Sequence, residues 1–154
     1  MPQTQRRPRG EGRLVIRTPK AADHARLAEL AGQLSYPSTA RQIAARLRAL
    51  HGRPDFAVFV AELDGQVAGW LGAYIFRAVE LDPAAKISGL VVEAGVRSRG
   101  IGQALLAAAE AWARRRGCAV ISVNCNVKRR RAHGFYLRNS YAWTKTQKVF
   151  RKPL

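Results

Sequence analysis

Apolar and polar residues follow the periods of strands and helices along the first half of the chain. A strand is predicted over residues 13–17, and helical spacing of apolar residues begins at Asp23 and again after Pro37-Ser38-Thr39. Residues 55–77 predict a hairpin of two strands, joined at Asp64-Gly65 in the type I′ manner. Glycines at 69 and 72 within its second strand indicate a bulge or a close approach by another backbone.

The next stretch, residues 87–117, predicts a strand, a turn and a helix. Residues 90–92 form a continuous apolar run, which is typical of a strand buried on both faces. From Ile101 the period becomes helical, and Gly117 supplies a stop. A short strand over residues 119–123 is predicted to run parallel to the first, because a helix connects them. The apolar stripe of the helix comprises Ile101, Leu105, Ala108, Ala109 and Trp112.

The turn between this strand and helix has the features of an anion site. Residues 97–102 read Arg-Ser-Arg-Gly-Ile-Gly at the start of the helix. The two glycines let an anion approach the main chain and permit positive φ, while the helix end adds free N–H groups and a positive dipole. Phosphate is the ligand that these features favour. A dinucleotide fingerprint and a P-loop both fail here, because Leu105 replaces a small residue and no Lys-Ser/Thr follows.

The sequence around this turn resembles the GNAT superfamily of acyl-CoA-dependent N-acetyltransferases. Arg97, Gly100 and Gly102 match its R/Q-x-x-G-x-G/A signature, and residues 132–141 are similar to a second family block. In that block Ser140 replaces the usual Gly. The matching residues of the second block are Ala132, Phe135, Tyr136 and Tyr141.

The resemblance covers residues 13–154 and implies an α/β (α+β) fold. The implied fold is a single domain with a mixed, mostly antiparallel central sheet, flanked by helices and containing a splayed parallel strand pair. A helix over residues 128–139 and closing strands within residues 141–150 complete the expected order. Residues 1–12 carry three arginines and no large apolar residue after Met1, which predicts a disordered basic tail.

The resemblance implies that acetyl-CoA is the co-substrate. We expect its pyrophosphate to bind the turn amides of residues 98–102, and the family implies that pantetheine lies along the preceding strand like an added strand. The candidate CoA-binding residues are Leu90, Val91, Val92, Arg97, Ser98, Arg99, Gly100, Ile101, Gly102, Gln103 and Asn126.

The implied reaction is direct acetyl transfer to a primary amine of a small molecule, a protein N-terminus or a lysine. By resemblance, Tyr136 is the general acid that protonates the leaving thiolate, although a phenol beside Phe135 also suits an apolar core. Residues 35–38 either line the acceptor side, as in the family, or form a surface turn. Cys118 and Cys125 have no metal-ligand spacing and are expected to be reduced and structural.

A carboxylate is needed to take a proton from the acceptor amine. Glu93 ends the predicted central strand and is the candidate base, directly or through a water; otherwise it pairs with Arg97 or Arg99. Glu80 and Asp82 are the alternatives, and the three carboxylates could gather beside the thioester.

The charge of the chain adds a constraint on partners. Its 154 residues include 27 Lys and Arg against 10 Asp and Glu, a formal net charge of +17, so an anionic partner is expected. Acetyl-CoA is one, and nucleic-acid or ribosome association is the alternative. The positive field predicts acceptors with little net positive charge. The chain has no apolar run long enough to span a membrane, so a cytoplasmic protein is expected. Whether it forms a homodimer is left open.

Overall fold

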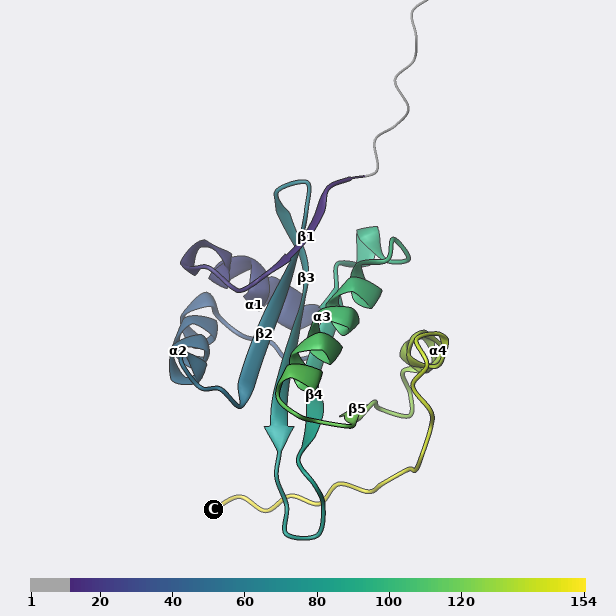
Figure 1. The fold of residues 1–154 in the computed structure, drawn as a ribbon. Helices are drawn as coiled ribbons and strands as arrows, with labels where there is room; N and C mark the ends of the chain where they lie inside the picture. Colours follow the sequence, from purple (N-terminus) through teal and green to yellow (C-terminus); the bar gives the residue numbers. More distant parts are fainter. Residues whose placement is uncertain (1–11) are drawn as a thin grey trace, which may run out of the picture. The chain divides into compact units, whose positions relative to one another are not determined.

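The computed structural model describes residues 12–154 (Figure 1). All of the predicted tail except Gly12 lies outside the described residues. The chain divides into two compact parts, one ending at Val123 and the other comprising Asn124–Leu154. We call the described residues of the first, 12–123, the sheet body and the second the C-terminal part, and we describe each by itself.

The sheet body is built on one five-stranded sheet whose order, β1-β2-β3-β4-β5, follows the sequence (Figure 1). Neighbouring strands are antiparallel except for β4 and β5, which are parallel. The predicted mixed, mostly antiparallel sheet with one parallel pair is therefore confirmed. The strands are β1 (Leu14–Arg17), β2 (Phe56–Leu63), β3 (Gln66–Phe76), β4 (Ala84–Val92) and β5 (Ile121–Val123).

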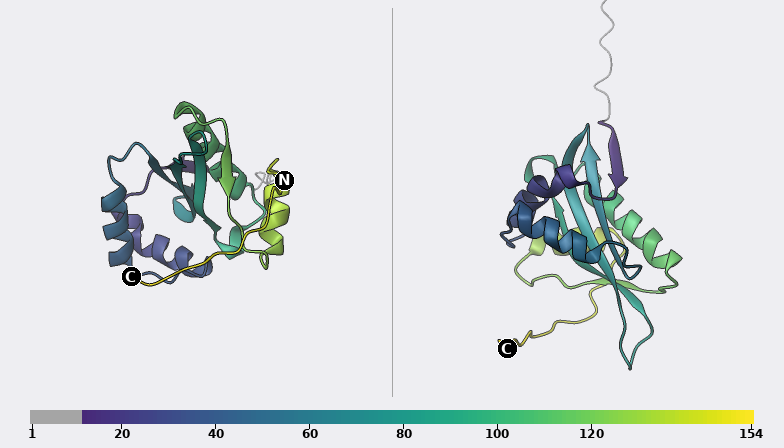
Figure 2. Two further views of the ribbon diagram at one scale, coloured as in Figure 1. Left: turned by 90° about the horizontal axis from the view of Figure 1, so that it is seen from below. Right: turned by 90° about the vertical axis from the view of Figure 1, so that its left-hand side faces the viewer.

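Helices cover both faces of this sheet. Helices α1 (His24–Gln33), which follows a short 3-10 turn at Ala21–Asp23, and α2 (Ala40–Leu50) lie on one face, and α3 (Ile101–Arg115) lies on the other (Figure 2). Helix α2 begins directly after residues 37–39, as the sequence predicts, and Thr39 caps it by accepting a hydrogen bond from the Gln42 N–H at 3.2 Å. The largest fully buried side chains are Leu30, Leu71, Ile101, Leu105, Leu106 and Val60.

The buried stripe of α3 is wider than predicted. Leu106 and Ala113 are buried, whereas Ala108, which was expected on the stripe, is only half-buried. A helix that covers a sheet presents a broad apolar face, so positions next to the expected stripe also reach the core. Gly117 has φ of 77° after the end of α3, and the Cys118 N–H donates to the Ala113 carbonyl, which confirms the predicted helix stop.

Strand β4 is longer and less buried than the sequence predicts. It begins at Ala84, and of the three residues expected to be buried on both faces only Val91 is; Leu90 and Val92 are half-buried. The prediction of a fully buried run is wrong because β5 is only three residues long. This end of β4 therefore lacks the neighbouring strand that would cover it.

A bulge accompanies the opening of the parallel pair. Strand β5 pairs with the first half of β4, ending at Ile87 opposite Val123, and leaves residues 90–92 unpaired on that side, as expected for a splayed parallel pair. On the β3 side Gly72 is opposite Gly89 while Ala73 is opposite Ile87, so Ser88 is the extra residue. Because a bulge bends its strand, β4 departs from the ladder just past its last pair with β5.

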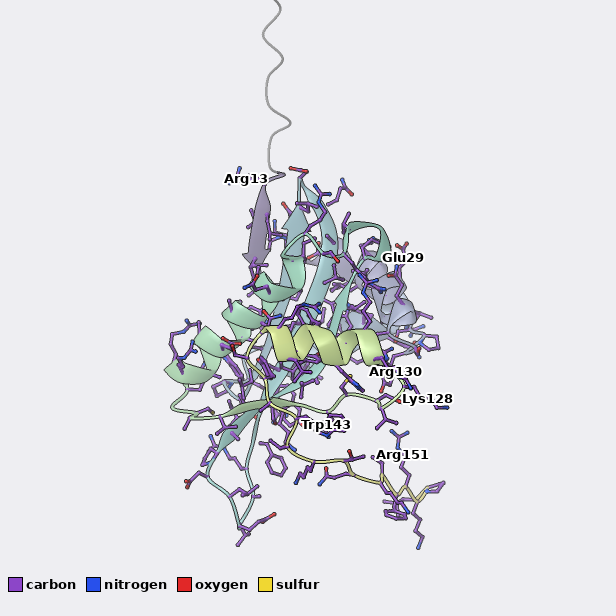
Figure 3. All side chains as sticks on the ribbon, turned by 90° about the vertical axis from the view of Figure 1, so that its right-hand side faces the viewer. Arg13, Glu29, Lys128, Arg130, Trp143 and Arg151 are labelled. Atoms are coloured by element: carbon purple, nitrogen blue, oxygen red, sulfur yellow. The ribbon has the colours of Figure 1, made fainter. Side chains whose placement is uncertain are left out.

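The C-terminal part contains one helix, α4 (Arg130–Arg138), narrower than the predicted 128–139. The closing strands expected within residues 141–150 are wrong: this segment has no regular secondary structure. Its apolar side chains, including Trp143 and Phe150, are exposed, and the Trp143 indole donates to the nearby Lys145 carbonyl at 3.2 Å (Figure 3). Alternating side chains predict a strand only where one face becomes buried.

Among residues 12–154, no helix is long and apolar enough to cross a membrane.

Candidate functional site

The turn before α3 has the backbone geometry of an anion cradle. Ser98 and Gly100 have φ of 64° and 79°, both in the left-handed region, and Gly100 is the N-cap of the helix. The first intrahelical bond runs from the Ala104 N–H to the Gly100 carbonyl at 3.0 Å. The N–H groups of the first helical turn before Ala104 therefore have no intrahelical acceptor. Space around Gly100 is open, since a Cβ there would meet nothing within 4 Å.

Arg97 is held in place by a hydrogen bond to the main chain. Its Nε donates to the Val92 carbonyl at 3.0 Å, so the side chain ties the turn to the end of β4. Arg99 is exposed. Arg97 therefore supports the shape of the turn as well as its charge.

The free side of β4 continues from this turn. Leu90, Val91 and Val92 are opposite Leu71, Trp70 and Gly69 of β3, and on their other side no strand pairs with them within residues 12–154. A Cβ on Gly69 would lie 2.6 Å from the Val91 carbonyl oxygen. The glycines of β3 thus mark both a bulge and a close backbone approach, as predicted. The stretch presents main-chain groups that an extended ligand could bond.

Glu93 is fixed by side chains from α1, which sequence reasoning did not find. Arg26 Nη2 donates to Glu93 Oε2, and Gln33 Nε2 lies 3.1 Å from both carboxylate oxygens. The Arg26 guanidinium and then the Gln33 amide lower the pKa of Glu93. Gln33 Oε1 also accepts from the Ala94 N–H at 3.3 Å. Neither Arg97 nor Arg99, the partners weighed from the sequence, forms the observed pair.

No local sequence signal could have revealed this cluster, because Arg26 and Gln33 are 67 and 60 residues from Glu93. Only the packing of α1 against β3 and β4 brings them together.

Glu80 and Asp82 are not near Glu93. Both are exposed in the loop before β4, whereas Glu93 follows its last residue. Nine residues of strand span about 30 Å, so the expectation that the three carboxylates gather is wrong. A continuous strand separates its two ends by its full length.

Tyr136 lies in α4 of the C-terminal part. Its ring centroid is 5.3 Å from that of Phe135 and 5.6 Å from that of Tyr141. Burial, and secondarily the Cys125 thiol, raises the pKa of Tyr136 to about 12. The phenol is therefore protonated at neutral pH and has its proton available.

The helix around Tyr136 ends in a left-handed residue. Ser140 has φ of 66°, and the Tyr141 N–H donates to the Tyr136 carbonyl at 3.0 Å. The substitution of Ser for the usual Gly therefore leaves the helix end closed, at the cost of a conformation that favours glycine.

Asn126 and Cys125 precede α4. The Asn126 side-chain oxygen accepts from the Lys128 N–H at 2.9 Å, and its carbonyl lies 2.9 Å from His133 Nε2. Asn126 thus organises the turn that leads into α4. Burial raises the pKa of Cys125, the opposite of what an activated nucleophile needs. Among residues 12–154, no group of His, Cys, Asp and Glu could hold a metal.

The segment between α1 and α2 is held by its own hydrogen bonds. Ser35 has φ of 69°, and the Tyr36 N–H donates to the Ala31 carbonyl at 2.9 Å. Arg46 donates to the Ser38 hydroxyl at 2.8 Å, while the Tyr36 side chain is exposed.

Known proteins resemble this chain in sequence. The family model described as the acetyltransferase (GNAT) family matches residues 24–141. An aminoalkylphosphonate N-acetyltransferase of Salmonella typhimurium is 36% identical over 89 residues, which cover 57% of this chain and 58% of that protein. An aminoglycoside N(6′)-acetyltransferase of Stenotrophomonas maltophilia is 30% identical over 103 residues, which cover 64% of this chain and 67% of that protein. The chain thus spans less than two thirds of the Salmonella relative.

Solved structures share the fold. An aminoglycoside N-acetyltransferase in complex with CoA has a TM-score of 0.83 at 22% identity and covers 96% of this chain and 99% of that one. Glucosamine-6-phosphate N-acetyltransferase from Arabidopsis thaliana has a TM-score of 0.77 at 19% identity, covering 90% and 98%. The five-stranded sheet, the turn at Gly100 and the family match over residues 24–141 agree, and the chain belongs to the GNAT family of acetyltransferases.

Proposed function

We propose that the protein transfers an acetyl group from acetyl-CoA directly to a primary amine. The observation that carries this proposal is the left-handed, open turn at Gly100, which leads from the free side of β4 into the N-terminus of α3. In a GNAT family member, this combination suits a ligand that has a pyrophosphate at one end and an extended amide-bearing arm at the other.

CoA would bind this part of the sheet body through main-chain groups. The pyrophosphate accepts hydrogen bonds from the amides of residues 98–102, and Arg99 adds charge from an exposed position. The pantetheine amides bond the backbone of Leu90, Val91 and Val92, which β5 leaves without a partner strand. Arg97 keeps the turn in register with the strand by holding the Val92 carbonyl.

The chemistry needs one proton donor and one proton acceptor. The amine nitrogen attacks the thioester carbonyl carbon, the C–S bond breaks, and the sulfur keeps the bonding electron pair. Tyr136 donates its phenolic proton to that sulfur, which a phenol with a pKa of about 12 still holds at neutral pH. Holding amine and thioester in contact supplies much of the rate, so no acyl-enzyme is needed.

Glu93 is the proposed base and takes the ammonium proton through a water. Because Arg26 and Gln33 lower its pKa, Glu93 is ionised at neutral pH but is a weak base. The amine must therefore lose its proton mainly because it binds beside a fixed carboxylate and water. We expect kcat/KM to rise with pH towards the pKa of the acceptor amine.

The acceptor we favour is a small amine that carries a phosphonate, phosphate or other anionic group. One relative is named for aminoalkylphosphonates and another for polycationic aminoglycosides, so similarity alone supports both. The net charge of +17 decides between them, because a positive field attracts anionic acceptors and repels polycations over about 8–10 Å.

Steady-state rates test this choice. We expect kcat/KM to be highest for 2-aminoethylphosphonate, lower for a neutral amine and lowest for an aminoglycoside. Added salt should reduce the advantage of the phosphonate, because screening weakens the long-range field. An aminoglycoside with the highest kcat/KM, falling as salt is added, would overturn the proposed acceptor while leaving acetyl transfer intact.

A nucleic-acid-binding role is the second candidate, and only the net charge favours it. A ligand that binds the folded protein raises its melting temperature by mass action. We expect acetyl-CoA to raise the melting temperature and a short oligonucleotide to leave it unchanged at physiological salt.

A further inference from the structure

We propose a second anion site at the other end of α3, suited to a single phosphate group on a small ligand. A cavity of about 320 Å³ lies in the sheet body between the start of β2, the end of β3 and the end of α3. Its lining residues are Pro54, Asp55, Ile75, Arg77, Arg115 and Arg116. This site is independent of the proposed acetyl transfer.

Three arginines from two separate segments line this cavity. Arg77 follows β3, while Arg115 and Arg116 lie at the end of α3. All three are exposed, and within the described residues none of them has a hydrogen-bonded or ion-paired side chain as partner. Their neighbour Arg114 differs, since its Nη2 lies 3.8 Å from Glu110 Oε2. The cavity therefore gathers arginines whose charges are not satisfied by the protein.

The acidic residue of the lining does not neutralise them. Asp55 is bound by Arg53, with Nε at 3.3 Å and Nη2 at 3.1 Å from its two oxygens. The Arg53 hydrogen bond and, more weakly, the charges of Arg53 and Arg77 lower the pKa of Asp55. One carboxylate thus faces four arginines, Arg53 and the three of the lining, so three positive charges remain around the cavity.

The helix dipole explains only part of this cluster. The carbonyl end of α3 attracts cations, which accounts for Arg115 and Arg116 and offsets about half a charge. Arg77 belongs to no helix, so the dipole gives no reason for its position. A bound anion that all three arginines contact accounts for the whole arrangement.

Phosphate is the chemistry that fits. Planar guanidinium groups bind phosphate oxygens in pairs, and several together neutralise a dianion. The cavity volume is at the lower end for small-molecule sites, which favours a phosphomonoester over a polymer. The Gly100 turn is at the opposite end of the 15-residue helix, about 22 Å away, so the two sites are separate.

Titration with inorganic phosphate, followed by backbone amide NMR, tests the site directly. Saturating CoA keeps the Gly100 turn occupied, and chloride holds the ionic strength constant. We expect saturable shifts confined to residues near 75–77 and 115–117. In the triple variant Arg77→Gln, Arg115→Gln, Arg116→Gln, affinity should fall at least tenfold. The matched control removes the same charge elsewhere on the surface, through Arg41→Gln, Arg48→Gln and Arg151→Gln, and should keep wild-type affinity.

Two further arms make the outcome decisive. If the triple variant does not fold, Arg77→Gln alone should still weaken phosphate binding by several-fold. Adenosine monophosphate should bind with the same residue shifts, whereas an oligonucleotide without terminal phosphate should not. The proposal would be overturned if phosphate binding did not saturate, or if the control variant lost as much affinity as the triple variant. It would also be overturned if the oligonucleotide bound with an affinity whose salt dependence corresponds to several phosphate contacts.

Discussion

The sheet body and the C-terminal part differ in what holds them together. In the sheet body, side chains from both helix layers and the sheet are fully buried. In the C-terminal part side chains are at most half-buried, and α4 is its single helix. The turn at Gly100, the proposed pyrophosphate site, is built into the buried framework, whereas Tyr136 belongs to the smaller part. Changes in the sheet body should therefore alter CoA affinity and stability, and changes around Tyr136 should alter turnover.

The largest effect is expected from Gly100→Asp. A carboxylate at the proposed pyrophosphate site should weaken CoA binding roughly 100-fold, or about 2.7 kcal/mol, by charge repulsion. Gly100→Asn is the matched control, because Asn tolerates positive φ and carries no charge. Gly117→Asp reproduces the same strain at φ of 77° beyond the other end of α3 and should keep wild-type affinity. Titration calorimetry measures the CoA affinity of all three variants. Unchanged affinity in Gly100→Asp would show that the turn does not bind CoA.

A second effect tests the stability of the sheet body. Arg17 joins β1 to the buried Asp23 at 2.7 Å and to Glu62 of β2 at 2.7 Å. Asp23→Asn removes one charge from this cluster and should lower the free energy of unfolding by about 2 kcal/mol at pH 7. Urea unfolding measures the loss, and kcat should stay unchanged. Asp82→Asn, in the exposed loop, should have no effect on stability.

The same variant should show a defined pH dependence. Hydrogen bonds from Arg17 lower the pKa of Asp23 in the folded state. Its contribution is therefore fully present above the unfolded pKa of about 3.9 and is lost as pH falls through the folded value. The difference between wild type and Asp23→Asn should be constant near neutrality and shrink below about pH 4. An equal difference at acidic pH would show that packing, and not charge, is responsible.

Tyr136→Phe tests the chemical role of the C-terminal part. Loss of the phenolic proton should lower kcat about tenfold or more, roughly 1.4 kcal/mol, with CoA affinity unchanged. Because the pKa of Tyr136 is about 12, the wild-type acid should stay protonated up to about pH 11, and the two pH profiles should have the same shape. Tyr141→Phe makes the same chemical change on the neighbouring ring. Unchanged turnover in Tyr136→Phe, with chemistry rate-limiting, would remove Tyr136 from the mechanism.

The smallest effect concerns the end of α4. Ser140 is held at φ of 66°, which glycine adopts without the Cβ penalty. Ser140→Gly should therefore stabilise the helix end by about 1 kcal/mol without changing kcat. Amide hydrogen exchange of residues 135–141 measures this; faster exchange in the variant would contradict it.

The two parts also differ in how well their sequences predict them. In the sheet body, the hairpin turn at Asp64-Gly65, the helix start after residues 37–39 and the stop at Gly117 were correctly predicted, because each depends on residues a few positions apart. In residues 141–150 the alternating pattern predicted strands that do not form. Alternation describes side-chain polarity, but a strand also needs a neighbouring edge.

Long-range contacts limit how much of the candidate site can be predicted from the sequence. The glycines and arginines of the turn could be identified from spacing, because their chemistry is local. The partners of Glu93 could not, since α1 supplies them from 67 and 60 residues away. The expectation that Glu80, Asp82 and Glu93 lie together was wrong for a related reason, because the length of β4 sets the distance between them.

Direct transfer is the central claim, and single-turnover mixing tests it most directly. The protein is mixed with one equivalent of acetyl-CoA, first alone and then with 2-aminoethylphosphonate, while thiol release and the mass of the protein are followed. The account predicts that CoA is released only when the amine is present, that the amine becomes acetylated, and that the protein mass never changes. One equivalent of CoA released without amine, together with an acetylated protein, would contradict it.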